Sequence, residues 1–182
     1  MRVWRSHLFS CLTSTDPSHG LTANLGARII SWCPVPSGAQ SYWPSEELCA
    51  QADVIITIAS AFEPLLEHSW IKPGTHLACM GTDTKGKQEV AADLVANATL
   101  FTDEIAQSVS IGETQHAIAA GSISEDSITS IGDVINGTHP GRSSADEITL
   151  FDGTGVGLQD LAVASVAAKL AEAQGKAQIV EL

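Results

Sequence analysis

Apolar and polar segments alternate along the chain in a way that predicts strands and helices in turn. The run 53–60, DVIITIAS, is nearly all apolar and β-branched, which is typical of a strand buried on both faces of a parallel sheet. Further strands are predicted over 75–80, 99–102 and 147–151. Helices are predicted over 46–52 (after Ser45 as N-cap), 67–71, 90–98 and 103–120, with an amphipathic helix over 158–174. This alternation indicates an α/β domain with a parallel sheet.

The composition supports one globular domain and narrows its partners. Of the 182 residues, 44% are apolar and 16% charged, and the net charge is −12. So acidic a chain is unsuited to bind nucleic acid or an anionic membrane over a large area, and we expect neither as a partner. The cysteines at 11, 33, 49 and 79 lack zinc-site spacing. With no secretory signal or membrane span recognised, we expect reduced cysteines and a cytoplasmic protein without a metal.

Residues 1–44 differ in amino-acid composition from the rest of the chain. They contain three Arg, one Asp and neither Lys nor Glu, although the whole chain is strongly acidic. A change of this kind within one small domain is unusual. We therefore treat 1–44 as an atypical segment and expect the regular α/β pattern from Ser45 onward.

Three predicted strands end in small or polar residues, at 57–60, 81–87 and 152–157. In open α/β sheets, ligands bind outside the carboxyl ends of the strands. We therefore expect these three segments to meet and to form the ligand-binding edge.

The segment 152–157, DGTGVG, permits two interpretations. Gly153, Gly155 and Gly157 follow a strand and precede a helix, as in a dinucleotide-binding loop. The GxGxxG spacing would require glycine where Leu158 stands, so a tight turn that binds no phosphate is the other interpretation. No other GxGxxG and no GxxxxGK[ST] motif occurs in the chain.

Asp83 is the acidic residue with the most promising position for chemistry. At a buried strand end its pKa could be raised for proton transfer, or it could stay ionised through Lys85 or Lys87. The alternative is an ordinary helix N-cap. Lys87 is either a solvated surface lysine or a phosphate ligand, and His116 is either a satisfied polar side chain or a base.

Three phrases carry a resemblance to a known family: MGTDTKGKQE, FTDEIAQSVSIGETQHAIAAG and FDGTGVGLQDLAVA. Together with ADVIITIAS they resemble the C-terminal two thirds of the ornithine cyclodeaminase/mu-crystallin family, over about 45–182. The phrases look most like those of members that reduce iminosuccinate to aspartate. The resemblance implies a Rossmann-type domain that binds NAD or NADP, a small imino or amino acid as substrate, and a homodimer.

The resemblance also implies roles for individual residues. Asp83 would be the acid/base residue beside the imine, where it protonates the imine nitrogen or holds the water or amine that does so. The cofactor would lie against Thr57, Ser60, Met80, Gly81, Lys87, Gly153 and Thr154, the last two near the nicotinamide. The family often has Ser where this chain has Gly153.

The N-terminal part departs from the family pattern. The residues MRVWR at 1–5 resemble the second Rossmann strand, and Arg5 falls where it would favour the 2′-phosphate of NADP. The preceding phosphate loop and the substrate-binding N-terminal half are not matched, which indicates an N-terminally truncated, frameshifted or misassigned reading. The domains expected are a remnant at 1–44, a partial NAD(P)-binding domain at 45–145, and a return segment at 146–182 whose strand and helix belong to the substrate and dimerisation domain.

Three functions remain open at this stage. The first is an NAD(P)H-dependent reductase of an amino-acid-derived imine, present here as a fragment that is inactive or weak alone. The second is ornithine cyclodeamination or alanine dehydrogenation, which would use Asp83 equally well. The third is a non-catalytic, mu-crystallin-like binding or dimerisation module.

Overall fold

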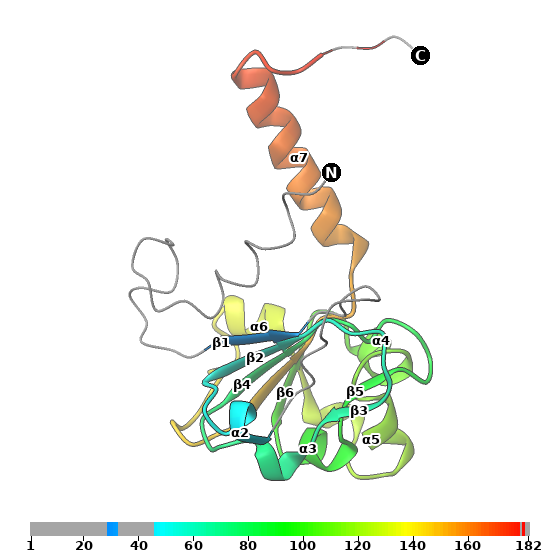
Figure 1. Cartoon of the computed structure of the whole chain (residues 1–182). Helices are drawn as coiled ribbons and strands as arrows, with labels where there is room; N and C mark the ends of the chain where they lie inside the picture. Colours follow the sequence, from blue (N-terminus) through cyan, green and yellow to red (C-terminus); the bar gives the residue numbers. More distant parts are fainter. Residues whose placement is uncertain (1–28, 33–45, 179, 181–182) are drawn as a thin grey trace.

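A six-stranded parallel sheet forms the centre of the computed structural model, which describes residues 29–32, 46–178 and 180 (Figure 1). Its strand order is β1-β2-β4-β8-β6-β7, and every neighbouring pair is parallel. The strands are β1 Ile29–Trp32, β2 Val54–Thr57, β4 His76–Cys79, β8 Thr149–Asp152, β6 Thr99–Thr102 and β7 Ile128–Ser130. The Rossmann-type α/β fold class predicted from the sequence is confirmed. The assignment of the strand in 146–182 to a substrate and dimerisation domain is wrong, because β8 lies between β4 and β6 in the middle of the main sheet.

A row of buried aliphatic side chains crosses the sheet at one level. Ile55 pairs with Leu77, Leu77 with Leu150, and Leu150 with Leu100. Each of these side chains is at most 2% exposed. Because side chains that are opposite one another in parallel strands point to the same face, this row forms the centre of the core on one side of the sheet.

The predicted strand 53–60 is shorter and less deeply buried than expected. Within β2, Ile55 and Thr57 are buried, whereas Val54 and Ile56 are only half-buried. The other side of this strand is therefore less completely covered, and the prediction of burial on both faces is wrong in part.

A second, two-stranded parallel sheet and several short helices complete the body of the domain. The small sheet pairs β3 Phe62–Leu66 with β5 Gln88–Val90, and neither strand was predicted, nor was β7. The helices are α2 Glu46–Cys49, η1 His68–Trp70, α3 Ala92–Ala96, α4 Ile105–Ser110, α5 Gln115–Ala119, η2 Glu125–Ser127, α6 Ile131–Ile135 and α7 Gly157–Ala173.

Of the predicted helices, one is divided and another is shortened by contacts with other parts of the fold. The predicted helix 103–120 is divided into α4 and α5 at Gly112, where a Cβ atom would overlap Asp152 and the backbone of Ser108. The predicted helix 90–98 is reduced to α3, because Val90 belongs to β5. In both places a tertiary contact overrides the local helical pattern.

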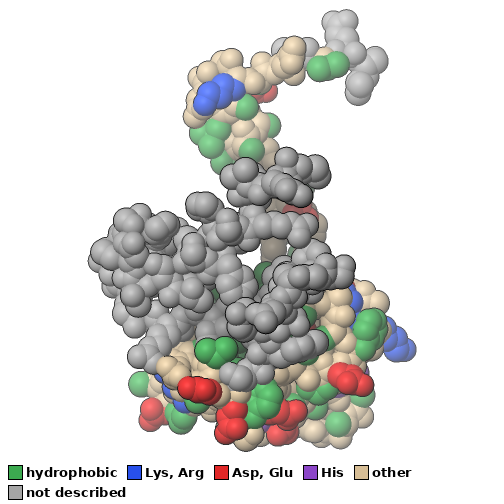
Figure 2. Space-filling model, in the orientation of Figure 1, with side chains coloured by type: hydrophobic (Ala, Val, Ile, Leu, Met, Phe, Trp, Pro, Cys, Tyr) green, Lys and Arg blue, Asp and Glu red, His purple; other side chains and the backbone are tan. Residues whose placement is uncertain are grey.

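Helix α7 extends away from the rest of the molecule (Figure 1). No residue in it is buried, and apolar side chains are visible on its surface (Figure 2). Its large exposed apolar side chains are Leu158, Leu161, Val163, Val166 and Leu170. Together with the alanines between them, they leave no distinct polar face, so the prediction of an amphipathic helix is wrong, although the helix itself lies where predicted.

The N-terminal segment contributes one described strand. Within 1–44 only β1 is described, and it pairs with β2 at the edge of the main sheet. The predicted strand at 1–5, with Arg5, and the predicted N-cap Ser45 lie outside the described residues. In the part of the chain that the structure describes, no helix is both long and apolar enough to cross a membrane.

Candidate functional site

The three strand ends expected to meet lie side by side. Thr57 at the end of β2 pairs with Cys79 at the end of β4, and Cys79 pairs with Asp152 at the end of β8. The segments that follow these residues therefore leave the sheet from one common edge. The prediction that 57–60, 81–87 and 152–157 converge is confirmed.

Asp83 lies exposed on this edge and forms an ion pair with Lys87. Lys87 Nζ is 2.6 Å from Asp83 Oδ1, and the Thr84 hydroxyl donates to the same oxygen at 3.0 Å. The hydrogen bond from Lys87 lowers the pKa of Asp83 below its usual value. The expectation of a buried carboxyl with a raised pKa is therefore wrong, and the alternative of a carboxylate kept ionised by a lysine is the one observed.

Asp83 is also not a helix cap, because a turn and the strand β5 follow it rather than a helix. Lys87 is not a solvated surface lysine, since its side chain is only 14% exposed and its ammonium group also lies 3.4 Å from the carbonyl oxygen of Gly81. The lysine thus approaches Asp83 from inside the protein. Its Nζ joins the two ends of the turn 81–87.

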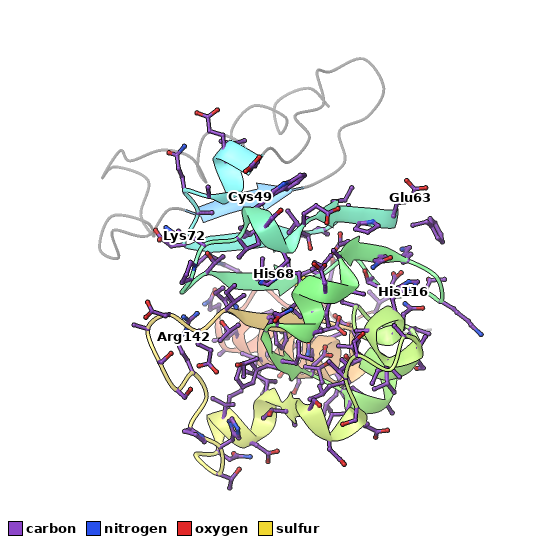
Figure 3. The ribbon with its side chains drawn as sticks, turned by 90° about the horizontal axis from the view of Figure 1, so that it is seen from below. Cys49, Glu63, His68, Lys72, His116 and Arg142 are labelled. Carbon is purple, nitrogen blue, oxygen red and sulfur yellow. The ribbon has the colours of Figure 1, made fainter. Side chains whose placement is uncertain are left out.

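His116 supports the same turn from α5. Its Nε2 lies 3.0 Å from the carbonyl oxygen of Lys87. This confirms the interpretation of His116 as a satisfied polar side chain. His116 and Glu63 lie on one side of the molecule and Lys72 and Arg142 on the other (Figure 3).

Gly81 permits the ends of β2 and β4 to approach closely. A Cβ atom at this position would overlap the backbone of Ala59 and the carboxylate of Glu89. The Gly81 N–H donates to Glu89 Oε2 at 3.1 Å, so it points into the protein. The structure explains this glycine by packing between loops.

Met80 and Gly153 occupy neighbouring positions on the same edge. Met80 is 43% exposed, and its thioether fills the space that a Cβ atom on Gly153 would need. A serine at 153, as is frequent in the resembling family, would therefore require Met80 to move. The structure brings these two predicted site residues into contact.

Thr154 anchors the glycine-rich loop to the end of β6. Its hydroxyl lies 2.7 Å from Asp103 Oδ1 and 2.9 Å from Gln107 Oε1, and its N–H donates to Asp103 at 3.0 Å. Burial alone would raise the pKa of Asp103, but the hydrogen bonds from Thr154 and the loop amides hold it below its usual value. The Thr154 side chain is thus directed into the protein. Gly155, with φ +79°, then turns the chain toward α7.

Thr57 and Ser60 differ in their exposure. Thr57 is 2% exposed and its hydroxyl donates to Glu89 Oε2 at 2.6 Å, whereas Ser60 is exposed. Of the two residues predicted to border a nucleotide, only Ser60 presents its side chain to the outside.

The sequence analysis missed three fully buried carboxyl groups behind this edge: Glu89 on β5, Glu113 before α5, and Asp152 on β8. Burial raises the pKa of Glu113 to about 8 and that of Asp152 to about 7, and it also raises the pKa of Glu89. The available signal was an acidic residue beside apolar ones, as in Glu89-Val90-Ala91. Among the residues that the structure describes, no three His, Cys, Asp or Glu side chains are arranged to hold a metal.

The comparisons with known proteins agree with the fold. The sequence model of the ornithine cyclodeaminase/mu-crystallin family matches residues 37–174. The iminosuccinate reductase of Paracoccus denitrificans is 53% identical over 168 residues, which are 85% of this chain and 52% of that protein. The crystal structure of that reductase in complex with NAD+ is similar, with a TM-score of 0.72 and 59% identity over 75% of this chain and 42% of the other.

An archaeal alanine dehydrogenase, solved as a dimer with bound NAD, is similar as well. Its TM-score is 0.72 and its identity 33%, over 80% of this chain and 46% of the other. The chain spans about half the length of the curated relatives it matches. The family match covers β2 to α7, and with them the edge described above.

Proposed function

Because the chain belongs to the ornithine cyclodeaminase/mu-crystallin family, we propose that it is part of an NAD(P)H-dependent reductase of an amino-acid-derived imine, of the type that converts iminosuccinate to aspartate. The observation that carries this proposal is the Asp83–Lys87 pair on the common edge of three parallel strands. The similarity to the Paracoccus denitrificans reductase supports the choice of substrate.

The residues of the edge fit a dinucleotide in part. Ile58 and Met80 are 45% and 43% exposed, and such apolar groups beside a strand end suit the flat rings of a nicotinamide or adenine. Ser60, Lys87 and Gly153 would complete the contacts on this edge. Thr57, Gly81 and Thr154 would hold the loops, because their donors already point into the protein.

Both NAD and NADP remain compatible with this edge. The similar structures were solved with NAD+ or NAD, which supports NAD. Arg5, which supports NADP on the basis of the sequence, lies outside the described residues.

Asp83 would act on the imine nitrogen as a carboxylate. Its lowered pKa, which is due first to the hydrogen bond from Lys87, means that it carries no proton to donate at neutral pH. It would therefore accept a hydrogen bond from the protonated imine and stabilise the iminium cation. The positive charge makes the iminium carbon more electrophilic than that of the neutral imine. The bound cofactor would supply the hydride to that carbon.

Lys87 would fix the position of this carboxylate. The ammonium group of Lys87 lies near the Gly81 carbonyl oxygen, and the backbone carbonyl of Lys87 contacts His116. The lysine is therefore held in place, and its ammonium group binds Oδ1 of Asp83. The other oxygen would remain available to the substrate. Hydride addition to the iminium carbon would give the neutral amine, which takes a proton from water, and the same carboxylate would then hold the resulting ammonium group.

We also propose a homodimer in which α7 is covered. Five large apolar side chains of α7 are exposed in the isolated chain, which is more than is usual for a helix that faces only solvent. The archaeal alanine dehydrogenase was solved as a dimer, which supports this proposal. We also propose that the protein works in the cytoplasm, on the basis of its similarity to the Paracoccus denitrificans reductase.

The test uses the purified 182-residue chain. NADH and NADPH binding is measured by fluorescence, and aspartate formation from iminosuccinate by NADH consumption with product identification. Binding together with aspartate formation supports the proposal. Because a fragment that is inactive or weak alone would also bind without turnover, the assay is repeated with a chimera in which residues 45–174 replace the matching part of the Paracoccus denitrificans reductase. Turnover of iminosuccinate by the chimera supports the proposal, and binding without turnover by the chimera would favour the non-catalytic module. Turnover of ornithine or alanine alone would favour those activities. Absence of binding by both the chain and the chimera would contradict the proposal.

A further inference from the structure

Glu89 is the buried carboxylate that joins the ends of two strands of the edge. Its side chain is 0% exposed. The Thr57 hydroxyl donates to Oε2 at 2.6 Å, the Gly81 N–H donates to the same oxygen at 3.1 Å, and the Ala59 N–H donates to Oε1. One donor group lies at the end of β4 and two at the end of β2, while Glu89 itself belongs to β5.

A carboxylate in this position is costly to bury without a cation. Among the described residues the ion pairs are Lys72–Asp53 and Lys87–Asp83, so Glu89 takes part in neither. Its burial depends first on hydrogen bonds from neutral donors, and the nearby charge of Lys87 makes a smaller contribution. An apolar side chain would fill the same place at lower cost, but it could not hold two N–H groups and a hydroxyl at fixed positions.

Glu89 is also connected to the third strand of the edge. Its own N–H donates to Glu113 Oε1 at 2.9 Å, and the N–H of Glu113 donates to Asp152 Oδ2 at 2.9 Å. Asp152 thus accepts a hydrogen bond from the backbone of Glu113, and Glu113 accepts one from the backbone of Glu89. The series links the end of β8 to the ends of β4 and β2.

We propose that Glu89 is a positioning residue of the cofactor-binding edge, which sets the relative positions of the loops after β2 and β4 through Thr57, Ala59 and Gly81. The predicted effect of Glu89 on cofactor binding rests on the proposed function, whereas its effect on the two loops does not. The neighbours of these anchors, Ile58, Ser60 and Met80, are exposed. Their places on the edge therefore depend on a side chain that does not touch the ligand.

The test compares E89Q with E63Q, a matched change of an exposed glutamate on β3. A glutamine has one acceptor oxygen in place of two, so it cannot accept all three hydrogen bonds. Amide hydrogen exchange at Ala59 and Gly81 is measured by NMR, and NADH affinity by titration. In E89Q we expect exchange at these two amides to accelerate on the order of tenfold or more, with the remote strand β7 unchanged. We expect NADH to bind on the order of tenfold more weakly.

A second pair of variants keeps the carboxylate and changes one donor. T57V removes the hydroxyl and T57S restores it, so T57V should weaken NADH binding and T57S should recover it. Both are small changes at one position, which keeps the test valid if E89Q fails to fold.

Two results would overturn the inference. One is unchanged exchange at Ala59 and Gly81 in E89Q, and the other is a lowered unfolding midpoint with unchanged NADH affinity, which would show a structural role alone. If the wild-type chain binds no NADH, the proposed function fails together with the cofactor part of this inference. The exchange data would then decide independently whether Glu89 holds the two loops.

Discussion

Lys87 and Asp83 form an ion pair whose two members differ greatly in exposure. The lysine side chain is 14% exposed and the aspartate 64%, with 2.6 Å between Nζ and Oδ1. A cation held from the inside therefore fixes an anion that faces outward. This arrangement keeps Asp83 ionised and ready to receive a positively charged group.

Replacing Lys87 by methionine should return the pKa of Asp83 toward its ordinary value. The hydrogen bond from Lys87 is the first cause of the lowered pKa, and methionine keeps the length of the side chain without its charge. NMR titration of the Asp83 carboxyl carbon measures the change. Lys85→Met is the control, since Lys85 is exposed and forms no ion pair within the described residues. An equal effect from both variants would contradict the assigned pair.

Asp83→Asn should lower kcat/KM for imine reduction on the order of 100-fold or more. The amide cannot carry the negative charge that stabilises the iminium cation. Since Asp83 is exposed and, among the described residues, forms an ion pair with Lys87 alone, the variant should keep its fold. Steady-state kinetics with Glu63→Gln as control, and NADH affinity in parallel, check the prediction. Full activity in D83N would remove Asp83 from the mechanism.

The stability of the chain should decrease as the pH rises from 6 to 9. Burial raises the pKa of Asp152 to about 7 and that of Glu113 to about 8, so the folded state binds more protons than the unfolded state in this range. The stabilisation from these groups is complete below their unfolded values near pH 4 and is lost as the pH passes about 7 and then 8. The expected loss is on the order of a few kcal/mol.

Urea unfolding at pH 6 and pH 9 measures this difference in the free energy of unfolding. Asp83 and Asp103 have lowered pKa values and complete their titration at lower pH, so they do not contribute in this window. Glu113→Gln should flatten the dependence, because the group that titrates near 8 is then absent. An unchanged slope in E113Q would contradict the assignment.

Gly81→Ala should destabilise the fold by roughly 1–3 kcal/mol, because the added methyl group overlaps Ala59 and Glu89. Gly157→Ala is the matched control. A Cβ atom at Gly157 meets nothing within 4 Å, and alanine at the start of α7 should leave stability unchanged or raise it by up to about 1 kcal/mol. The free energy of unfolding in urea distinguishes the two. Equal stability of both variants would argue against the close approach of β2 and β4.

The exposed helix α7 should make the chain associate at high concentration. Sedimentation velocity should show dimers of the wild-type chain that dissociate in the double variant V166E/L170E, since charges replace two exposed apolar side chains. Lys169→Glu, on the same turn, changes the charge without removing an apolar group. If it dissociates the dimer to the same extent, charge and not apolar contact holds the copies together.

The main strands could be predicted from the sequence because each is a short apolar run ending in small polar residues. The convergence of their ends followed from the parallel arrangement alone, since strands in register bring Thr57, Cys79 and Asp152 to one edge. Gly112 could not be recognised as a break between two helices. Its effect depends on Asp152, which is distant in the sequence and adjacent only in the fold.

The buried carboxyl groups escaped prediction for a related reason. Glu89 follows a lysine and a glutamine, and its hydroxyl donor Thr57 lies 32 residues away. A charged residue is expected at the surface unless its partners are known. The exposure of Asp83 was missed in the same way, because the strand before it is buried while the turn that carries it projects outward.

The position of β8 has a consequence for how the chain acquires its structure. It is the last of the described strands in the sequence, yet it lies between β4 and β6 in the sheet. As the chain leaves the ribosome, β1, β2 and β4 can pair with one another, and so can β6 and β7, but these two groups have no common edge until residues 149–152 arrive. The sheet therefore closes only after β8 has been synthesised, with two open strand edges exposed until then.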